Sequence, residues 1–207
     1  LSEISFKINN KIPNNIIAVT GTNGKSSVAD FFHQILTLNR LSVATIGTLG
    51  IKAKTIKKNN LTSPDVISLH KELNNLKKKK IDNVLIEASS HGLDKERLDG
   101  VNIKAGIFTN FSQDHLDYHK SMKKYLNAKL ILFKKILKNN SYIITDRNIP
   151  EFKKIKKIAD NKGFKKIFID YIKNEYDLTN FKPIGNFQKK NLIMAIKACE
   201  VLGLNKK

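Results

Sequence analysis

The chain has 207 residues, of which 41% are hydrophobic, and it carries a formal net charge of +20. This length and hydrophobic fraction support one large folded domain and exclude a chain that is disordered throughout. No apolar run approaches the roughly 20 residues that span a bilayer, and no signal peptide is visible, so we expect a cytoplasmic protein without a membrane partner. The single cysteine, Cys199, excludes an internal disulfide and is expected in the core.

The positive charge comes almost entirely from lysine, since the only arginines are Arg40, Arg97 and Arg147. Proteins that read phosphates and bases favour the two-pronged guanidinium of arginine. The lysines here accompany many Asn and Ile residues, which is typical of A/T-rich coding. A basic nucleic-acid binding module is therefore only a weaker alternative, and we expect no nucleic acid partner.

Apolar segments of strand length alternate with longer amphipathic segments, and this alternation predicts an α/β fold with a mainly parallel sheet flanked by helices. Residues 52–60 are basic and polar and are expected to form a mobile loop. In chain order we expect a strand over 16–20, a helix over 25–39, strands over 42–46, 84–88 and 105–109, a helix over 121–137, strands over 142–145 and 167–170 with a Lys-rich helix between them, and a last helix over 188–202.

One further helix is expected to begin near Ser63, with Ser63 as its N-cap and Pro64 in its first turn. Its apolar stripe is Val66, Leu69, Leu73 and Leu76. The run Lys77–Lys80 falls at its C-terminal end, where cations suit the helix dipole, and is expected to be solvated.

The strongest local signal is a glycine-rich loop between the first predicted strand and the first predicted helix. Its sequence from Val19 to Ser27 is VTGTNGKSS. Glycines let backbone N–H groups turn toward a phosphate, Lys25 can reach the β- and γ-phosphates, and the Ser26 hydroxyl can join a Mg²⁺ shell. Val19 stands where the strict phosphate-loop pattern has its first glycine, so the loop is of phosphate-loop type without matching that pattern.

Three later segments join this loop in a family resemblance. They are EASSHGL from Glu87, TNFSQDHLDYH from Thr109 and YLNAK from Tyr125. Together with the loop they resemble the central domain of the Mur ligases, the ATP-dependent amide ligases of peptidoglycan synthesis. Within that family they are most similar to the branch that adds meso-diaminopimelate or L-lysine to UDP-MurNAc-L-Ala-D-Glu through an acyl phosphate.

The resemblance implies an enzyme, an acid–amino-acid ligase, with ATP and Mg²⁺ as cofactors. It implies nucleotide contacts from Gly21, Thr22, Asn23, Gly24, Lys25, Ser26, Ser27, Asn110 and Asn191. It implies metal contacts from Ser26, Glu87, His115 and Lys129, and catalytic roles for Lys25, His115 and a carbamylated Lys129. It implies contacts to the UDP-sugar peptide from Thr62, Ser63, Ser89 and Arg97.

Carbamylation agrees with simple chemistry, because a buried lysine has a lowered pKa and its neutral amine can react with CO₂. On the residues alone, however, Lys129 on an amphipathic helix is more often a snorkelling lysine. An isolated Glu or His is likewise more often a satisfied or surface residue, so the roles of Glu87 and His115 rest on the resemblance.

The resemblance also predicts a domain organisation. Residues 1–15 are expected to be the tail of an N-terminal UDP-binding domain, and residues 16–207 the central ATP-binding domain, with the C-terminal amino-acid-binding domain absent from this chain. We expect a monomer whose substrates are the UDP-MurNAc dipeptide and an amino acid. A folylpolyglutamate synthase-like ligase, which shares a similar loop, is the main alternative.

Overall fold

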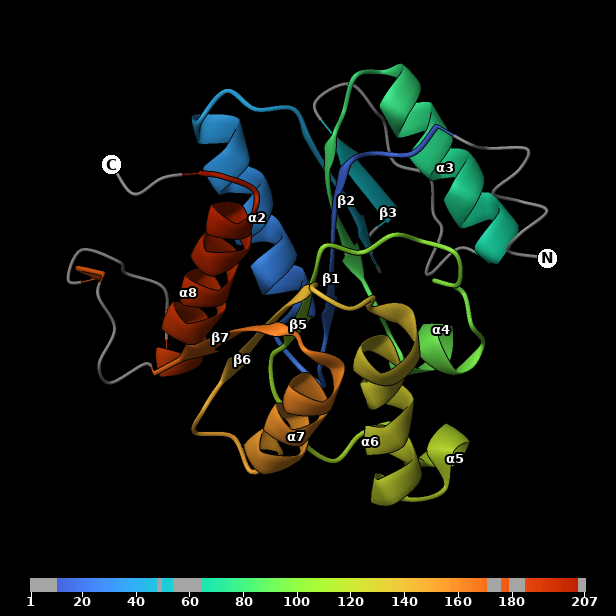
Figure 1. Cartoon of the computed structure of the whole chain (residues 1–207), viewed down its shortest axis with the longest axis vertical. Coiled ribbons are helices and arrows are strands. Elements are labelled where there is room, and N and C mark those ends of the chain that lie inside the picture. Colours follow the sequence, from blue (N-terminus) through green and yellow to red (C-terminus); the bar gives the residue numbers. More distant parts are fainter. Residues whose placement is uncertain (1–10, 48–49, 54–64, 171–175, 179–184, 205–207) are drawn as a thin grey trace.

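The computed structural model describes residues 11–47, 50–53, 65–170, 176–178 and 185–204 (Figure 1). Its strands are β1 (Asn15–Thr20), β2 (Val43–Gly47), β3 (Gly50–Ala53), β4 (Asn83–Glu87), β5 (Ala105–Phe108), β6 (Tyr142–Asp146) and β7 (Lys165–Ile169). Its helices are α2 (Lys25–Leu38), α3 (Val66–Lys78), α4 (Ser90–Asp94), α5 (Leu116–His119), α6 (Met122–Ile131), the π-helical turn η1 (Leu132–Ile136), α7 (Phe152–Lys162) and α8 (Asn186–Val201).

The strands form one sheet in the order β3-β2-β4-β1-β5-β6-β7. Every pairing is parallel except that of β2 with β3. The predicted mainly parallel α/β fold is therefore confirmed. From β1 the chain crosses to β2 and β4 on one side, and β5 then lies on the other side of β1. Ligands bind beyond the carboxyl ends of the strands at such a switch in strand order.

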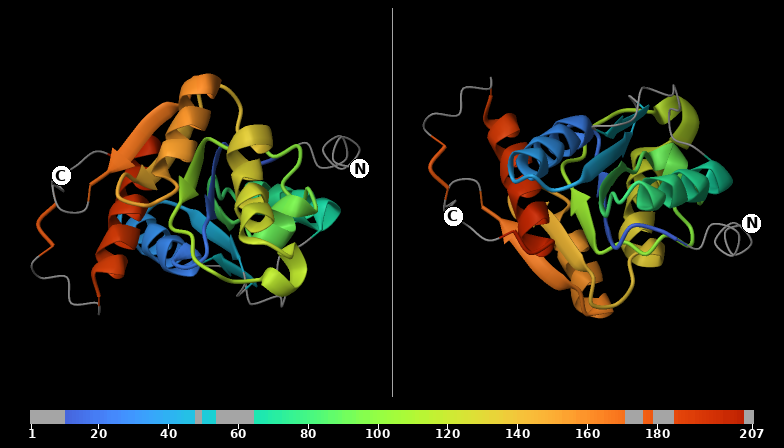
Figure 2. Two further views of the ribbon diagram at one scale, coloured as in Figure 1. Left: turned by 90° about the horizontal axis from the view of Figure 1, so that it is seen from below. Right: turned by 90° about the horizontal axis from the view of Figure 1, so that it is seen from above.

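Helices cover both faces of the sheet, as the two end-on views show (Figure 2). The central strand β1 demonstrates why: Ile16 and Ala18 belong to one apolar cluster, while Ile17 and Val19 belong to the other. Successive side chains of a strand point to opposite faces of the sheet, so a strand that is apolar throughout must be covered by other elements on both faces. Helices α2 and α8 pack on one face, and α3, α4, α6 and α7 pack on the other.

Two predictions about the region after β2 are wrong. The loop predicted over 52–60 is wrong for Lys52 and Ala53, which belong to β3 and pair antiparallel with β2, while residues 54–60 lie outside the described residues. Helix α3 begins at Val66, and its N-cap is Asp65 rather than Ser63. The Asp65 carboxylate accepts hydrogen bonds from the backbone N–H groups of Ile67 and Ser68 at 2.9 and 3.0 Å. The carboxylate of Asp65, two residues after Ser63, therefore satisfies the N–H groups at the start of the helix.

The remaining elements lie within a few residues of their predicted positions. The predicted helix over 121–137 is present but ends in the π-helical turn η1, and the short helices α4 and α5 were not predicted. Cys199 is buried and reduced, as expected. In the part of the chain that the structure describes, no helix is both long enough and apolar enough to cross a bilayer.

Candidate active site

The glycine-rich loop joins β1 to α2 at the centre of the sheet. Gly24 adopts φ 85° directly before α2, a left-handed conformation that glycine tolerates best. A Cβ at Gly21 would lie 1.9 Å from Thr109 Oγ1, and a Cβ at Gly24 would lie 2.6 Å from Asn191 Oδ1. The loop therefore needs glycine at both positions, because the side chains of Thr109, directly after β5, and of Asn191 in α8 lie against its backbone.

Lys25 folds back over the loop from the first turn of α2. Its Nζ donates to the carbonyl oxygens of Gly21 at 3.0 Å and Thr22 at 2.8 Å. Burial lowers the pKa of Lys25, while the negative charges of Glu87 and Asp114 raise it. The ammonium group thus lies at the loop, where it could meet a phosphate.

The segment after β5 holds the loop backbone from the other side. Asn110 Oδ1 accepts a hydrogen bond from Asn23 N at 2.9 Å, and the Thr109 hydroxyl donates to Asn23 O at 2.6 Å. Asn191 lies beside Gly24 and donates to Gln188 Oε1 at 3.2 Å. The structure therefore brings both of these predicted nucleotide-binding residues, Asn110 and Asn191, to the loop, and their contact with the nucleotide stays a prediction.

Glu87 ends β4, beside Val19 of β1 in the register of the sheet. The hydroxyl of Ser26 donates to Glu87 Oε2 at 2.8 Å. Burial raises the pKa of Glu87, while the Ser26 hydrogen bond and the charge of Lys25 lower it. A hydroxyl and a carboxylate side by side are hard oxygen donors, which suit Mg²⁺.

Lys129 lies on the opposite side of the loop and is only 1% exposed. Its Nζ donates to Gly21 O at 2.7 Å and lies 4.4 Å from the centre of the Tyr125 ring. Burial, and then the nearby charge of Lys25, lower its pKa to about 7, against a weaker opposing effect of Asp114. Lys129 is therefore not a snorkelling residue: its amine is inside the site, and a large fraction of it is neutral near pH 7.

His115 lies at the start of α5 with φ 50°, and its Nε2 is 3.4 Å from Asp114 Oδ2. Its ring lies 5.9 Å from that of Tyr125 and 5.1 Å from that of His91. Within the described ranges, no three His, Cys, Asp or Glu side chains come together as a ready metal site. The predicted metal contacts of Ser26, Glu87, His115 and Lys129 therefore stay a prediction.

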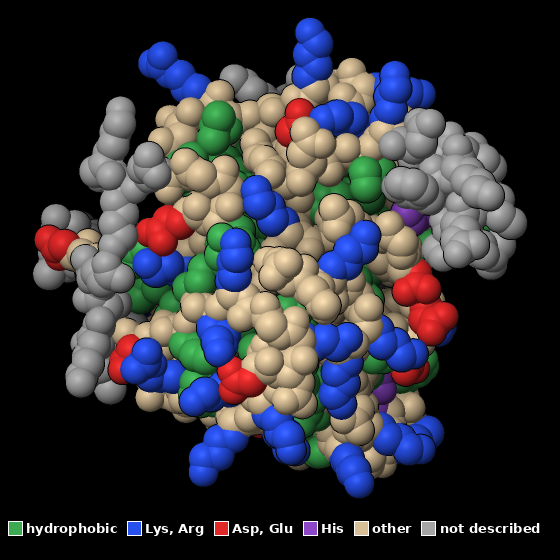
Figure 3. Space-filling model, in the orientation of Figure 1, with side chains coloured by type: hydrophobic (Ala, Val, Ile, Leu, Met, Phe, Trp, Pro, Cys, Tyr) green, Lys and Arg blue, Asp and Glu red, His purple; other side chains and the backbone are tan. Residues whose placement is uncertain are grey.

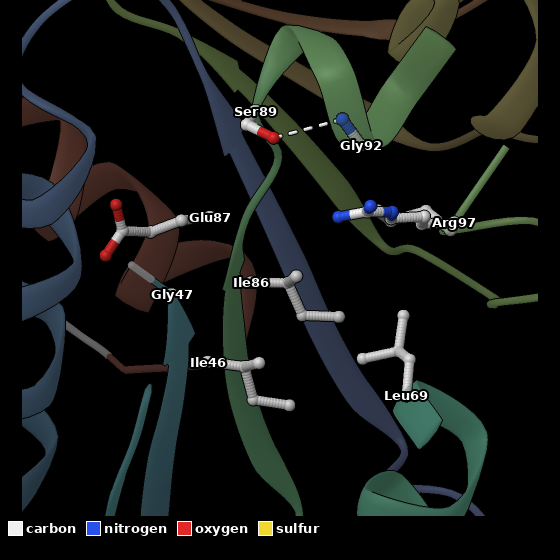
Figure 4. A pocket seen from close by; sticks show the side chains of 9 residues that line it. Ile46, Gly47, Leu69, Ile86, Glu87, Ser89, Gly92 and Arg97 are labelled. Atoms are coloured by element: carbon white, nitrogen blue, oxygen red, sulfur yellow. Dashed lines mark hydrogen bonds between the residues drawn. The ribbon is translucent and has the colours of Figure 1, made fainter. Parts of the chain in front are cut away.

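The predicted substrate residues Ser89 and Arg97 lie together at a small pocket next to Glu87 (Figure 4). Ser89 is the N-cap of α4, where its Oγ accepts a hydrogen bond from Gly92 N at 3.0 Å. The Arg97 side chain points toward this turn, and Ile46, Leu69 and Ile86 form an apolar wall below it (Figure 4). The other two predicted substrate residues, Thr62 and Ser63, lie outside the described residues.

Sequence reasoning missed several residues that shape the site. Gly47, the last residue of β2, lies against the Glu87 side chain. His119 is buried, with Nε2 2.9 Å from the hydroxyl of Ser90. Tyr125, which was recognised only as part of a family segment, contacts the loop directly. The pairing of His119 with Ser90 carries no local signal, whereas Gly47 could have been found as a glycine at the end of a buried strand.

We predict that Gly47→Ala disturbs the metal side of the site without unfolding the domain. A Cβ at Gly47 would lie 2.0 Å from Glu87 Oε1, so the flexible Glu87 side chain must turn away from Ser26. We expect ATP affinity measured by calorimetry to fall about tenfold with Mg²⁺ present and to change little in EDTA. The reason is that the contact between the Glu87 carboxylate and Mg²⁺ can be lost only when the metal is present. Glu87→Gln should show the same pattern. Equal losses of ATP affinity with Mg²⁺ and with EDTA would contradict the assignment of Glu87 as a metal ligand.

Similarity to known proteins agrees with this geometry. The model of the Mur ligase middle domain matches residues 19–195. A UDP-N-acetylmuramoyl-L-alanyl-D-glutamate--2,6-diaminopimelate ligase of Rickettsia bellii (strain RML369-C) is 38% identical over 211 residues, which cover 89% of this chain and 44% of that protein. The ligase of the same name from Brucella melitensis biotype 1 is 47% identical over 128 residues, or 61% of this chain and 26% of the relative.

Solved structures give the same result for the fold. The structure of a diaminopimelate ligase of that name superposes with a TM-score of 0.84 at 26% identity, over 99% of this chain and 46% of the other. A bifunctional folylpolyglutamate synthase/dihydrofolate synthase with Mn, AMPPNP and L-glutamate bound reaches a TM-score of 0.71 at 17% identity, over 100% of this chain and 58% of the other, and so shares the fold. The chain spans about half the length of the first diaminopimelate ligases it matches. It belongs to the Mur ligase family, to whose middle domain it corresponds.

Proposed function

We propose that this chain binds ATP with Mg²⁺ and performs the phosphoryl-transfer part of an ATP-dependent amide ligase of peptidoglycan precursor synthesis. The observation that carries the proposal is the glycine-rich loop with Lys25 above it, Glu87 on one side and Lys129 on the other. Membership of the Mur ligase family supports it. The names of its relatives favour diaminopimelate as the added amino acid.

The reaction proposed has two steps. The D-glutamate side-chain carboxylate of UDP-MurNAc-L-Ala-D-Glu attacks the γ-phosphorus of ATP, and ADP leaves as an acyl phosphate forms. The amine of diaminopimelate then attacks the acyl carbon, loses a proton and displaces phosphate. Lys25 and the backbone N–H groups of Gly21–Gly24 stabilise negative charge on the transferred phosphoryl group, which is where such enzymes gain most of their rate.

The donors at the loop fit a divalent ion. Ser26 and Glu87 would hold Mg²⁺ at the loop, and His115 and a carbamate on Lys129 would supply further ligands for divalent metal. When bound, Mg²⁺ neutralises charge on the phosphate oxygens. The neutral amine of Lys129 reacts with CO₂ to give the carbamate and a proton. Its remaining N–H can still donate to Gly21 O, so the loop contact survives the modification.

Arg97 and Ser89 are proposed to bind the UDP-linked peptide. Arg97→Lys keeps the charge but loses the planar fork that pairs with a carboxylate or phosphate. We expect it to weaken binding of UDP-MurNAc-L-Ala-D-Glu about tenfold and to leave ATP affinity unchanged, as measured by calorimetry. Arg147 follows β6, which is two strands away from β1 in the sheet, and the matched exchange Arg147→Lys should change neither affinity. Unchanged dipeptide binding by Arg97→Lys would remove Arg97 from the substrate site.

The same measurement separates the candidate functions. Saturable binding of UDP-MurNAc-L-Ala-D-Glu without binding of folate supports the Mur ligase assignment, and the reverse would support a folylpolyglutamate synthase-like enzyme. The nucleic-acid alternative predicts salt-dependent binding of DNA or RNA. The Lys and Arg side chains on the visible face are interleaved with neutral residues and are denser over its lower half, without forming one continuous stripe (Figure 3).

Residues 1–207 by themselves are expected to bind ATP but not to form the amide bond. An amine that is not held in a pocket reacts slowly, because orientation supplies much of the rate of such a step. The measurement is release of phosphate and of the amide product from UDP-MurNAc-L-Ala-D-Glu, ATP and diaminopimelate. Rapid ligation by these residues alone would show that the amino-acid pocket lies within them.

A further inference from the structure

Tyr125 lies in the first turn of α6 and is completely buried. Its hydroxyl donates a hydrogen bond to Thr22 Oγ1 at 3.3 Å. Its ring lies under Lys129 Nζ at 4.4 Å, and its centre is 5.1 Å from the ring of Phe111 and 5.1 Å from that of His119. One side chain therefore contacts the glycine-rich loop, the buried amine and two further segments of the site.

The Thr22 hydroxyl is fully used in this arrangement. It donates to Ser112 O at 3.2 Å and accepts from Ser112 N at 3.0 Å and from Tyr125. A hydroxyl has one hydrogen and two lone pairs, so no hydrogen-bonding capacity remains. Because the Thr22 carbonyl also accepts from Lys25 Nζ at 2.8 Å, the position of Thr22 helps to set that of Lys25.

Phenylalanine would fill the same volume as Tyr125 but would leave one lone pair of the buried Thr22 hydroxyl without a donor. A buried polar group that loses its partner costs more than the average hydrogen bond contributes. Burial also raises the pKa of Tyr125, so its phenol stays protonated and remains a donor. The Tyr125 hydroxyl therefore donates a hydrogen bond that phenylalanine could not supply.

We propose that Tyr125 is a positioning residue, which ties Thr22 of the glycine-rich loop to helix α6 and so fixes the distance between the phosphate-binding backbone and Lys129. The proposal rests on the proposed ATP-binding function. Positions 125 and 129 are four residues apart and share one face of α6, so a single rigid helix turn presents both groups to the loop.

The test compares Tyr125→Phe with a matched change. Tyr142→Phe is the control, because the Tyr142 ring also lies near a lysine, with Lys165 Nζ 5.1 Å from its centre, but at the other end of the sheet. We expect calorimetry to show ATP binding weakened about three- to tenfold in Tyr125→Phe and by less than twofold in Tyr142→Phe. Equal ATP affinity of Tyr125→Phe and the unmodified chain would overturn the proposal.

A double-mutant cycle with Thr22→Val tests the bond from its other end. If Tyr125 acts through Thr22, Tyr125→Phe should cost little further affinity once Thr22 has lost its hydroxyl. If the double variant instead lost ATP affinity by the product of the two single losses, Tyr125 would act independently of Thr22. Thr22→Val also replaces Tyr125→Phe as the test if the latter does not fold.

A spectroscopic signature distinguishes positioning from general support of the fold. The chain has five tyrosines, so ¹⁹F NMR of protein labelled with 3-fluorotyrosine gives few signals, and Tyr125→Phe identifies that of Tyr125. Addition of Mg²⁺ and AMPPNP should shift the Tyr125 signal and leave that of Tyr142 in place. A Tyr125 signal that does not respond while AMPPNP binds contradicts the inference, whereas failure of the unmodified chain to bind AMPPNP contradicts the proposed function.

Discussion

Lys25→Ala is expected to lower ATP affinity by at least about 100-fold, because it removes an ammonium group that is held against the loop backbone at Gly21 and Thr22. A hydrogen bond to a charged group contributes about 1.5–3 kcal/mol, and Lys25 can make more than one to the phosphates. Isothermal titration calorimetry with ATP and Mg²⁺ measures the loss. The thermal unfolding temperature should change little, since Lys25 is not packed in either apolar cluster.

Lys104→Ala is the matched control for this experiment. Lys104 is exposed, precedes β5 at the opposite end of the sheet and donates to Asn15 Oδ1 at 3.2 Å. Lys104→Ala removes the same positive charge as Lys25→Ala. It therefore measures how much ATP affinity depends on the overall positive charge of the chain. If both variants lost affinity equally, the loop would not be the nucleotide site.

Lys129→Met is expected to raise the free energy of unfolding in CO₂-free, metal-free buffer at pH 7 by about 2–4 kcal/mol. Each unit of pKa difference between folded and unfolded chain corresponds to about 1.4 kcal/mol, and burial lowers the pKa of Lys129 from 10.5 to about 7. Between pH 7 and 10.5 the unfolded chain binds the proton that the folded chain has released. The unmodified chain should therefore gain stability as pH rises through this window, and Lys129→Met should not.

Lys197→Met provides the contrasting variant. Lys197 donates to Glu200 Oε2 at 3.0 Å and lies near the Tyr176 ring. Burial lowers the pKa of Lys197, but the hydrogen bonds and charges of Tyr176 and Glu200 together raise it above its usual value. Its replacement should destabilise the chain, because it removes a favourable ion pair. Urea unfolding at several pH values measures both variants. Destabilisation by Lys129→Met at pH 7 would mean that the Lys129 ammonium is better stabilised than its burial indicates.

With bicarbonate and Mg²⁺ present, the unmodified chain should become more stable than Lys129→Met. A carbamate changes the charge of Lys129 from positive to negative and creates a ligand for the metal, and binding to the folded state alone stabilises it. The carbamate itself should appear in ¹³C NMR spectra of protein equilibrated with labelled bicarbonate. Its absence, together with undiminished Mg²⁺ binding by Lys129→Met, would leave Lys129 unmodified.

Much of the fold could be predicted because its determinants are local. The four apolar residues from Ile16 to Val19 and the repeating stripe of α2 reveal their patterns within one element. The glycine-rich loop is equally local, since glycine, lysine and serine are adjacent in the chain at a strand–helix junction. The N-cap of α3 was misjudged because Ser63 and Asp65 both satisfy the local pattern, and only the path of the backbone selects Asp65.

The sequence by itself therefore determined the parallel α/β architecture, the position of the phosphate loop and, through the family segments, the set of candidate residues. Tertiary structure alone decided that β3 pairs antiparallel, that Gly47 makes room for Glu87, and that Tyr125 and Lys129 reach the loop from more than 100 residues away. The physical reason is that these contacts depend on which strands become neighbours in the sheet. The low pKa of Lys129 is likewise a property of its burial, which arises only when α6 packs over the end of β1.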